Sequence, residues 1–211
     1  MPATRVHLVR HGEVHNPGGV LYGRLPHFHL SENGHAMARS AANSLKSSGA
    51  PLVKLVVSPL TRTQESAAPI AQIFGLTPDL DQRVIEPYNF FEGRKVSAKT
   101  IALRPRLLFH LRNPMQPSWG EPYAEVVARM TEAMTEAANS VASGEVAIVT
   151  HQLPIWAMHL HLAGQKLAHN PAKRRCALSS ITSFDFVDGK FREVGYVDPA
   201  AELERVDRGA V

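Results

Sequence analysis

The chain has 211 residues, of which 44% are hydrophobic and 20% charged, and this size and composition predict one ordinary globular domain over residues 1–211. The net charge of +4 is modest and no dense basic block is present, which argues against a nucleic-acid partner. A single cysteine, Cys176, excludes an internal disulfide, and no signal-peptide pattern or membrane-spanning run is found, so we expect a cytoplasmic protein without membrane contact.

The first predicted element is a buried strand over residues 5–9, an apolar run with β-branched members. Arg10, His11 and Gly12 follow it directly, at the end of a strand where open α/β sheets bind ligands. Arginine presents a planar fork of donors suited to phosphate or carboxylate, and histidine offers a nucleophile or base near neutral pH. Glycine lets the backbone come close to a ligand. Taken alone, the tripeptide is equally consistent with a solvated turn.

A loop, a helix and a second strand are predicted next. The loop, residues 16–29, is rich in glycine and proline. Ser31 can accept a hydrogen bond from a helix amino terminus, so we expect a helix from this residue to about residue 48. Residues 52–57 form another apolar run and predict a second buried strand.

A second helix is predicted immediately after this strand. Ser58 is expected to be its N-cap and Pro59 its first residue, and the helix is expected to end near residue 74. Arg62 lies in its first turn. A short third strand is predicted over residues 83–85, just before Glu86.

Residues 87–122 are rich in proline, glycine, arginine and aromatic residues and have no clear period. We expect this segment to cover a site rather than to form a second domain. Its basic side chains either form a solvated face or bind a second anionic group of a substrate. These residues are Arg94, Lys95, Lys99, Arg104, Arg106 and Arg112.

The last third of the chain predicts a helix over residues 123–143, a buried strand over 146–149, a helix over 154–162 and a hairpin over 180–196. His151 lies just beyond the buried strand. Strands alternate with helices along the chain. The pattern therefore predicts an α/β fold, a three-layer sandwich with a mostly parallel central sheet and helices on both faces.

Two histidines, His11 and His151, each follow a buried strand. Parallel strands bring their carboxyl ends to the same edge of a sheet, so we expect these imidazoles to meet, with Arg10, Arg62 and Glu86 within reach. A phosphoryl group in transfer needs cationic donors on its oxygens, an in-line nucleophile and an acid for the leaving oxygen. The set contains all three, so the sequence predicts a site for phosphoryl transfer.

The chain resembles the histidine phosphatase superfamily, the phosphoglycerate mutase-like enzymes. The resemblance rests on motifs across most of the chain: residues 8–13 (LVRHGE), 57–67 (VSPLTRTQESA), Glu86 before 90–93 (FFEG), Gly120-Glu121 leading to Arg129, and 149–151 (VTH). It implies that His11 becomes phosphohistidine and that Arg10, Arg62 and His151 bind the phosphoryl group. It also implies that Glu86 donates the proton, and that no metal and no organic cofactor takes part.

Four features depart from the family's pattern. Val14 stands where threonine or serine is usual, and Asn16 lies one residue earlier than the family's phosphate-contacting asparagine. The spacing between Glu86 and Glu92 is one residue shorter than usual, which leaves open which of the two is the proton donor. Gln152 replaces the glycine that usually follows the second histidine.

Further residues are expected to line the substrate pocket, and some groups are expected not to form sites. The predicted pocket residues are Asn16, Tyr22, Gly23, Arg24 and Gln152. The other histidines do not follow metal-binding spacings, so no metal site is predicted. The basic run of residues 173–175 is expected to be a solvated loop.

We therefore predict a phosphomonoester hydrolase that acts on a small phosphorylated metabolite through a covalent phosphohistidine. A mutase, which returns the phosphoryl group to a second hydroxyl, is the enzyme alternative and requires exclusion of water. A phosphoprotein phosphatase is another. A non-catalytic phospho-ligand-binding protein would be expected to lack His11 or its acid. The oligomeric state is left open, with a homodimer as one option.

Overall fold

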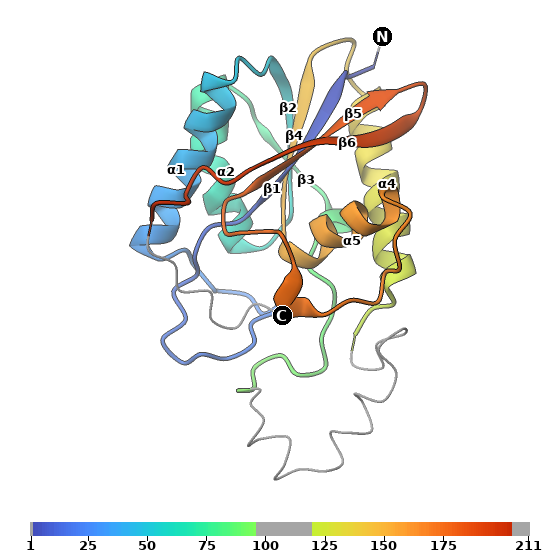
Figure 1. Cartoon of the computed structure of the whole chain (residues 1–211). Helices are drawn as coiled ribbons and strands as arrows, with labels where there is room; N and C mark the ends of the chain where they lie inside the picture. Colours follow the sequence, from blue (N-terminus) through green and yellow to red (C-terminus); the bar gives the residue numbers. More distant parts are fainter. Residues whose placement is uncertain (1, 96–119, 204–211) are drawn as a thin grey trace.

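The computed structural model describes residues 2–95 and 120–203 (Figure 1). In this part of the chain one sheet has the strand order β3-β2-β4-β1-β5-β6. The strands are β1 (Arg5–Arg10), β2 (Leu52–Val57), β3 (Pro78–Leu80), β4 (Glu145–Thr150), β5 (Ile181–Val187) and β6 (Lys190–Val197). The strands β1 to β4 pair in parallel, whereas β5 pairs antiparallel with β1 and β6 antiparallel with β5.

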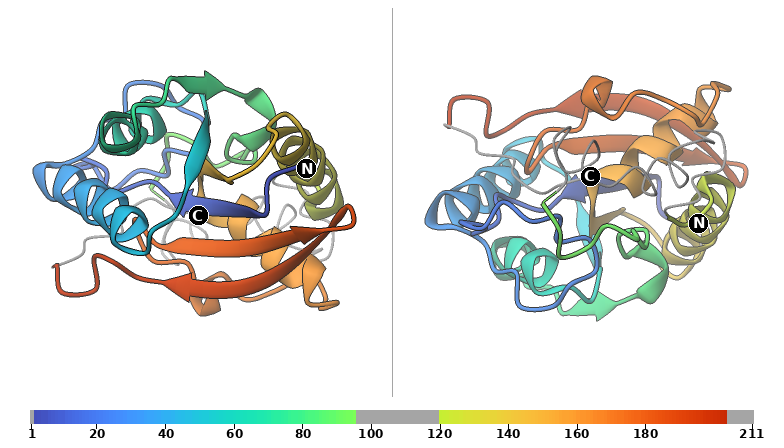
Figure 2. Two further views of the ribbon diagram at one scale, coloured as in Figure 1. Left: turned by 90° about the horizontal axis from the view of Figure 1, so that it is seen from above. Right: turned by 90° about the horizontal axis from the view of Figure 1, so that it is seen from below.

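Four α-helices accompany the sheet in the described residues: α1 (Glu32–Ser47), α2 (Thr61–Phe74), α4 (Tyr123–Asn139) and α5 (Gln152–Leu162). The helices α1 and α2 cover one face of the sheet, and α4 and α5 cover the other (Figure 2). The three-layer α/β prediction is therefore confirmed. No helix of the described residues has both the length and the apolar character needed to cross a bilayer.

Strand β1 forms the centre of the molecule because its two faces are both buried. Val6 and Leu8 belong to the core under α4 and α5, whereas Val9 belongs to the core under α1 and α2. This alternation follows from the strand period of two residues. Each of these side chains is at most 1% exposed, and burial of such a side chain stabilises a fold by roughly 1.5–3 kcal/mol.

The register of β1 and β4 decides where the functional residues lie. Arg10 is paired with Thr150, so both strands end at the same level of the sheet. His11 follows Arg10 and His151 follows Thr150, so the two histidines are neighbours. The predicted meeting of the two histidines is thus a direct result of parallel pairing.

The prediction for the third strand is wrong. Residues 82–84 form a 3₁₀ turn, η1 (Gln82–Val84), and the third strand is the exposed β3 before it. The Asp81 carboxylate accepts a hydrogen bond from the Arg83 backbone amide at 2.7 Å, which favours a turn. Val84 is buried in the core under α4 without pairing in the sheet.

Three helix ends also differ from the predictions. Helix α5 begins at Gln152 rather than at residue 154. Helix α2 begins at Thr61, with Leu60 rather than Ser58 at the N-cap position. Helix α4 ends at Asn139 instead of residue 143. The hairpin is confirmed, because Asp188 and Gly189 both have positive φ, at 51° and 75°, as a tight two-residue turn requires.

Candidate active site

Five predicted side chains converge at the carboxyl edge of the sheet: Arg10, His11, Arg62, Glu86 and His151. All five are buried, with at most 6% exposure. The rings of the two histidines lie 5.3 Å apart. Arg62 Nη2 lies 3.3 Å from His151 Nδ1, and Glu86 Oε2 lies 3.7 Å from the same nitrogen. The structure therefore brings together the whole set expected from the strand ends.

The geometry around His11 determines which ring nitrogen can react. Its Nδ1 lies 2.8 Å from the Gly12 carbonyl oxygen, which can only accept a hydrogen bond. Nδ1 therefore carries the proton, and Nε2 carries the lone pair of the neutral ring. Burial, together with Arg62 and Arg10, lowers the pKa of His11 well below its usual value. A neutral, nucleophilic imidazole is the result.

The loop after β1 is held against the start of α1 by close packing. A Cβ atom on Gly12 would lie 2.4 Å from the Gly34 carbonyl oxygen, so a larger residue would force the two segments apart. The Gly12 amide donates to Ser66 Oγ at 3.0 Å. Glu13 accepts a hydrogen bond from Ser31 Oγ at 2.6 Å. The glycine and glutamate of this motif thus position the histidine rather than act on a ligand.

His151 has a different tautomer, which its partners define. Arg62 can only donate, so the 3.3 Å contact makes His151 Nδ1 an acceptor. His151 Nε2 then donates to Ser58 Oγ at 2.7 Å. Burial and the nearby Arg62 guanidinium lower the pKa of His151 well below its usual value. The Ser58 hydroxyl, predicted to cap α2, is therefore used to orient this histidine.

The two arginines are held by backbone carbonyl groups. Arg10 Nη1 donates to the Cys176 carbonyl oxygen at 2.7 Å. Arg62 Nη2 donates to the Gly23 carbonyl oxygen at 2.6 Å, and its guanidinium lies 4.7 Å from the centre of the Tyr22 ring. These contacts fix two cations beside His11, an arrangement suited to the oxygens of a phosphoryl group.

Glu86 and Glu92 have distinct surroundings. Burial raises the pKa of Glu86 above its usual value, against the opposing effect of Arg62 and Arg174. Glu92 Oε1 instead accepts backbone hydrogen bonds from Arg24 at 3.0 Å and Asn89 at 3.1 Å. The carboxyl beside His151 is that of Glu86, while Glu92 holds a loop together.

Three predicted pocket residues bond to the protein itself. Asn16 Nδ2 donates to the Val20 carbonyl oxygen at 2.8 Å, and the Val20 amide donates back to Asn16 Oδ1 at 3.2 Å. Arg24 Nε donates to the Glu86 carbonyl oxygen at 2.5 Å. Gln152 Nε2 is 3.5 Å from the Cys176 carbonyl oxygen. These side chains support the walls of the site.

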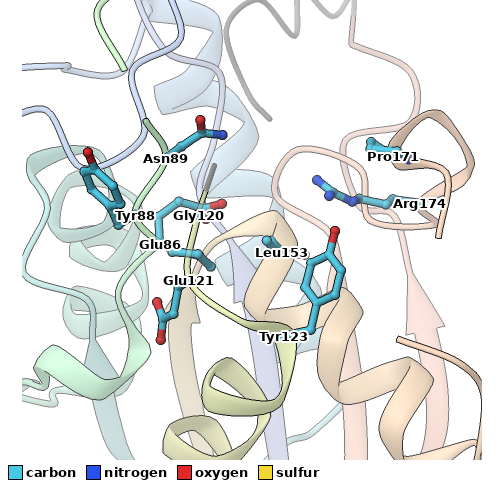
Figure 3. Close-up of a pocket in the computed structure, with 10 residues that line it drawn as sticks. Glu86, Tyr88, Asn89, Gly120, Glu121, Tyr123, Leu153, Pro171 and Arg174 are labelled. Carbon is cyan, nitrogen blue, oxygen red and sulfur yellow. The ribbon is translucent and has the colours of Figure 1, made fainter. Parts of the chain in front are cut away.

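The prediction of a solvated loop over residues 173–175 is wrong for Arg174. Its side chain lines a pocket of about 40 Å³ beside Glu86, across from Asn89 and next to Tyr123 (Figure 3). The chain after α5 turns back through η3 (Pro171–Lys173), and Arg174 Nη1 donates to Gln152 Oε1 at 3.1 Å. No local pattern in a run of basic residues indicates such a long-range contact.

Much of the predicted covering segment lies outside the described residues, including Lys99, Arg104, Arg106 and Arg112. Of its described cations, Arg94 lies over the Phe90 ring at 5.0 Å. Within residues 2–95 and 120–203, no group of three or more histidine, cysteine, aspartate and glutamate side chains is placed to hold a metal ion.

The opposite pKa shifts of His11 and Glu86 predict that activity falls toward alkaline pH. The lowered pKa keeps His11 neutral below its usual value of 6.5, so acid does not remove the nucleophile there. The raised pKa keeps Glu86 protonated above its usual value of 4.5, and activity falls as the pH passes the raised value. We expect kcat/KM for an alkyl phosphate, measured from about pH 4 to about pH 8, to decrease toward the alkaline end. A rate that increases steadily over this range would contradict the assignment of Glu86 as the acid.

Comparisons with known proteins agree with this geometry. The profile of the histidine phosphatase superfamily (branch 1) matches residues 6–199. An uncharacterised protein of Mycobacterium tuberculosis (strain H37Rv) is 50% identical over 199 residues, which cover 94% of this chain and 98% of that protein.

Two solved structures are also similar. The mycobacterial glucosyl-3-phosphoglycerate phosphatase in complex with VO3 has a TM-score of 0.73 and 26% identity, covering 90% of this chain and 97% of that chain. Bacillus stearothermophilus YhfR shares the fold, with a TM-score of 0.75 and 21% identity over 98% of this chain and 97% of its own. With the superfamily profile matching residues 6–199 and the two histidines meeting at the sheet edge, the chain belongs to the histidine phosphatase superfamily, branch 1.

Proposed function

We propose that this protein hydrolyses phosphomonoesters of small metabolites through a phosphohistidine at His11. The observation that carries the proposal is the buried neutral imidazole, whose Nε2 carries the lone pair and which lies beside two cations and a second histidine. A nucleophile of this kind can attack phosphorus while Arg10 and Arg62 stabilise the charge on the phosphoryl oxygens. His151 lies beside the same oxygens in this proposal.

The reaction proceeds in two steps. His11 Nε2 forms a bond to phosphorus as the bond from phosphorus to the leaving oxygen breaks, and Glu86 gives its proton to that oxygen. The Glu86 carboxylate then takes a proton from water, whose oxygen attacks phosphorus as the nitrogen–phosphorus bond breaks. Inorganic phosphate leaves, and both His11 and Glu86 return to their starting protonation states.

Other activities on the same site are distinguished by specific observations. A non-catalytic role is disfavoured because both the nucleophile and the acid are present and buried together. The similarity to a glucosyl-3-phosphoglycerate phosphatase supports hydrolysis over transfer to a second hydroxyl. The close relatives are uncharacterised, so they name no substrate.

The proposal is tested by incubating the purified protein with a panel of phosphorylated sugars, hydroxy acids, amino acids and a phosphopeptide. Release of inorganic phosphate from a small ester, absent in His11→Ala, supports the proposal. Formation of a positional isomer of the ester without phosphate release identifies a mutase. Turnover of the phosphopeptide alone identifies a phosphoprotein phosphatase.

Activity is expected to be independent of divalent metal ions, because the proposed chemistry uses arginine cations in place of a metal. Treatment with a chelator, followed by gel filtration, should leave kcat on 4-nitrophenyl phosphate within about twofold of the untreated protein. Loss of activity that one added metal restores would contradict the cofactor-free mechanism.

A further inference from the structure

Glu86, the proposed general acid, lies in a segment without regular secondary structure. The turn η1 ends at Val84, and residues 85–86 belong to no strand or helix. His11 and His151, by contrast, directly follow strands whose pairing fixes their ends. Buried carbonyl groups of an irregular segment need hydrogen-bond donors from elsewhere in the chain. The donors around Glu86 therefore decide where its carboxyl lies.

Two arginines hold the backbone at the two ends of residues 83–86. Arg129, on α4, donates through Nη1 to the Arg83 carbonyl oxygen. Arg24, in the loop after β1, donates through Nε to the Glu86 carbonyl oxygen at 2.5 Å. The path of this segment consequently depends on where two guanidinium groups lie.

Glu121 joins these two arginines. Its Oε2 accepts from Arg24 Nη2 at 2.9 Å and from Arg129 Nη2 at 3.1 Å, and its Oε1 accepts from Arg129 Nε at 2.7 Å. The side chains of Glu121 and Arg129 are only 12% and 15% exposed, so solvent screens their attraction less than that of a surface pair. Glu121 lines the same pocket as Glu86, on a neighbouring segment (Figure 3). We call these three side chains the Arg24–Glu121–Arg129 bridge.

A further donor reaches the same segment from β4. Thr150 is fully buried, and its Oγ1 donates to the Val84 carbonyl oxygen at 2.6 Å. Thr150 directly precedes His151, so this bond ties the backbone before Glu86 to the strand end that carries the second histidine. The bridge therefore fixes the part of the segment that this bond leaves free, including Glu86 itself.

The position of Glu86 matters because of the step that it performs. A general acid works only within hydrogen-bond reach of the oxygen that receives its proton. Displacement of a reacting group by about 1 Å can cost about 10²-fold in rate. Loss of a contact that holds the Glu86 backbone should therefore affect proton transfer before it affects the other parts of the reaction.

We propose that Glu121 is a positioning residue for the general acid. By joining Arg24 to Arg129 it fixes the backbone of residues 83–86, and with it the Glu86 carboxyl beside the leaving oxygen. Glu121 does not touch the reacting atoms in this role. The inference rests on the proposed function, and the failure of one is distinguishable from the failure of the other.

The test is Glu121→Gln, which keeps the size of the side chain and removes the charge that holds both guanidinium groups. Single-turnover phosphorylation by the alkyl phosphate that the wild type hydrolyses fastest should slow by about 10–100-fold. Phosphorylation by 4-nitrophenyl phosphate should slow by less than about threefold, because nitrophenolate leaves without a proton. A residue that only stabilises the fold would not produce this dependence on the leaving group.

A double-mutant cycle tests whether Glu121 acts through Glu86. In the Glu86→Gln background no acid remains to be positioned, so adding Glu121→Gln should change the alkyl phosphate rate by less than about threefold. If the effects of the two substitutions multiply instead, Glu121 acts independently of Glu86 and the proposal is wrong.

Glu132→Gln is the matched control. Glu132 also pairs with an arginine of this segment, at 3.1 Å from Arg83 Nη1, but its side chain is 68% exposed and the contact holds no backbone carbonyl group. It should leave both phosphorylation rates unchanged. Thermal unfolding verifies that each variant is folded. If Glu121→Gln is not folded, Arg24→Gln carries the test with the same expected selectivity, because the Arg24 side chain is 36% exposed and its loss disturbs the core less.

The two failures differ in what is measured. If Glu86→Gln shows the selective loss but Glu121→Gln slows both substrates equally, or neither, the bridge does not position the acid and the phosphatase mechanism stands. If no ester is hydrolysed, the proposed function fails, and crystal structures of the wild type and Glu121→Gln still test the bridge. A Glu86 carboxyl displaced from His151 in the variant supports the bridge, and an unmoved carboxyl overturns it.

Discussion

Replacement of His11 by alanine is expected to lower kcat by roughly 10⁴-fold or more, because it removes the only nucleophile that the mechanism uses. The fold should persist. The imidazole makes one hydrogen bond to the Gly12 carbonyl oxygen, and such a bond contributes about 1 kcal/mol. Steady-state kinetics on 4-nitrophenyl phosphate, with circular dichroism and thermal unfolding, measure both expectations.

His35→Ala is the control, because His35 is exposed on α1 and away from the cluster. It should leave kcat unchanged. Rapid quenching of the wild-type protein with a labelled ester should trap a phosphoenzyme that is labile in acid and stable in alkali, as a phosphoramidate is. Label on a serine or aspartate, or a phosphoenzyme in His11→Ala, would contradict the mechanism.

Replacement of Glu86 by glutamine is expected to have the second-largest effect, and its size should depend on the leaving group. An alkoxide needs a proton to depart, whereas nitrophenolate leaves readily without one. General-acid help is worth about 10²–10⁴-fold, so phosphorylation of the enzyme by an alkyl phosphate should slow by that factor. Phosphorylation by 4-nitrophenyl phosphate should slow far less.

Single-turnover rates are required for this comparison, since the second step needs the Glu86 carboxylate as base for every substrate. Glu92→Gln is the matched control. Glu92 Oε1 accepts from the Arg24 and Asn89 amides, so its loss should alter stability or KM without leaving-group dependence. If Glu92→Gln shows the selective loss and Glu86→Gln does not, Glu92 is the acid.

The identity of the cluster could be predicted because its members follow local patterns. His11 and His151 each lie two residues after a short apolar run rich in β-branched residues. The shortness and composition of such runs favour buried parallel strands. Arg10 is paired with Thr150, and both strands are buried from their second residue to their last. Local hydrophobicity and chain order were sufficient for this part.

The partners of these residues could not be predicted in the same way. Ser58 fits the rule for a helix N-cap, yet its hydroxyl bonds to His151, 93 residues further along the chain. The choice of Glu86 or Glu92 as the acid likewise depends on a loop contact. The Asn89 backbone amide donates to Glu92, and this leaves Glu86 as the carboxyl beside His151. A side chain with several possible partners bonds to the one that folding brings closest. The distance in space between two side chains cannot be read from their separation in the sequence.

The α/β class, the parallel sheet and the edge at which the histidines lie were determined by the sequence itself, because apolar runs and their order specify strands and their ends. Only the tertiary structure decided that Arg174 enters the pocket beside Glu86. In the chain, this residue stands between Lys173 and Arg175 and resembles any solvated cation. Its side chain donates a hydrogen bond to Gln152 Oε1, which lies 22 residues earlier in the chain. The return of the chain after α5 brings these two residues together.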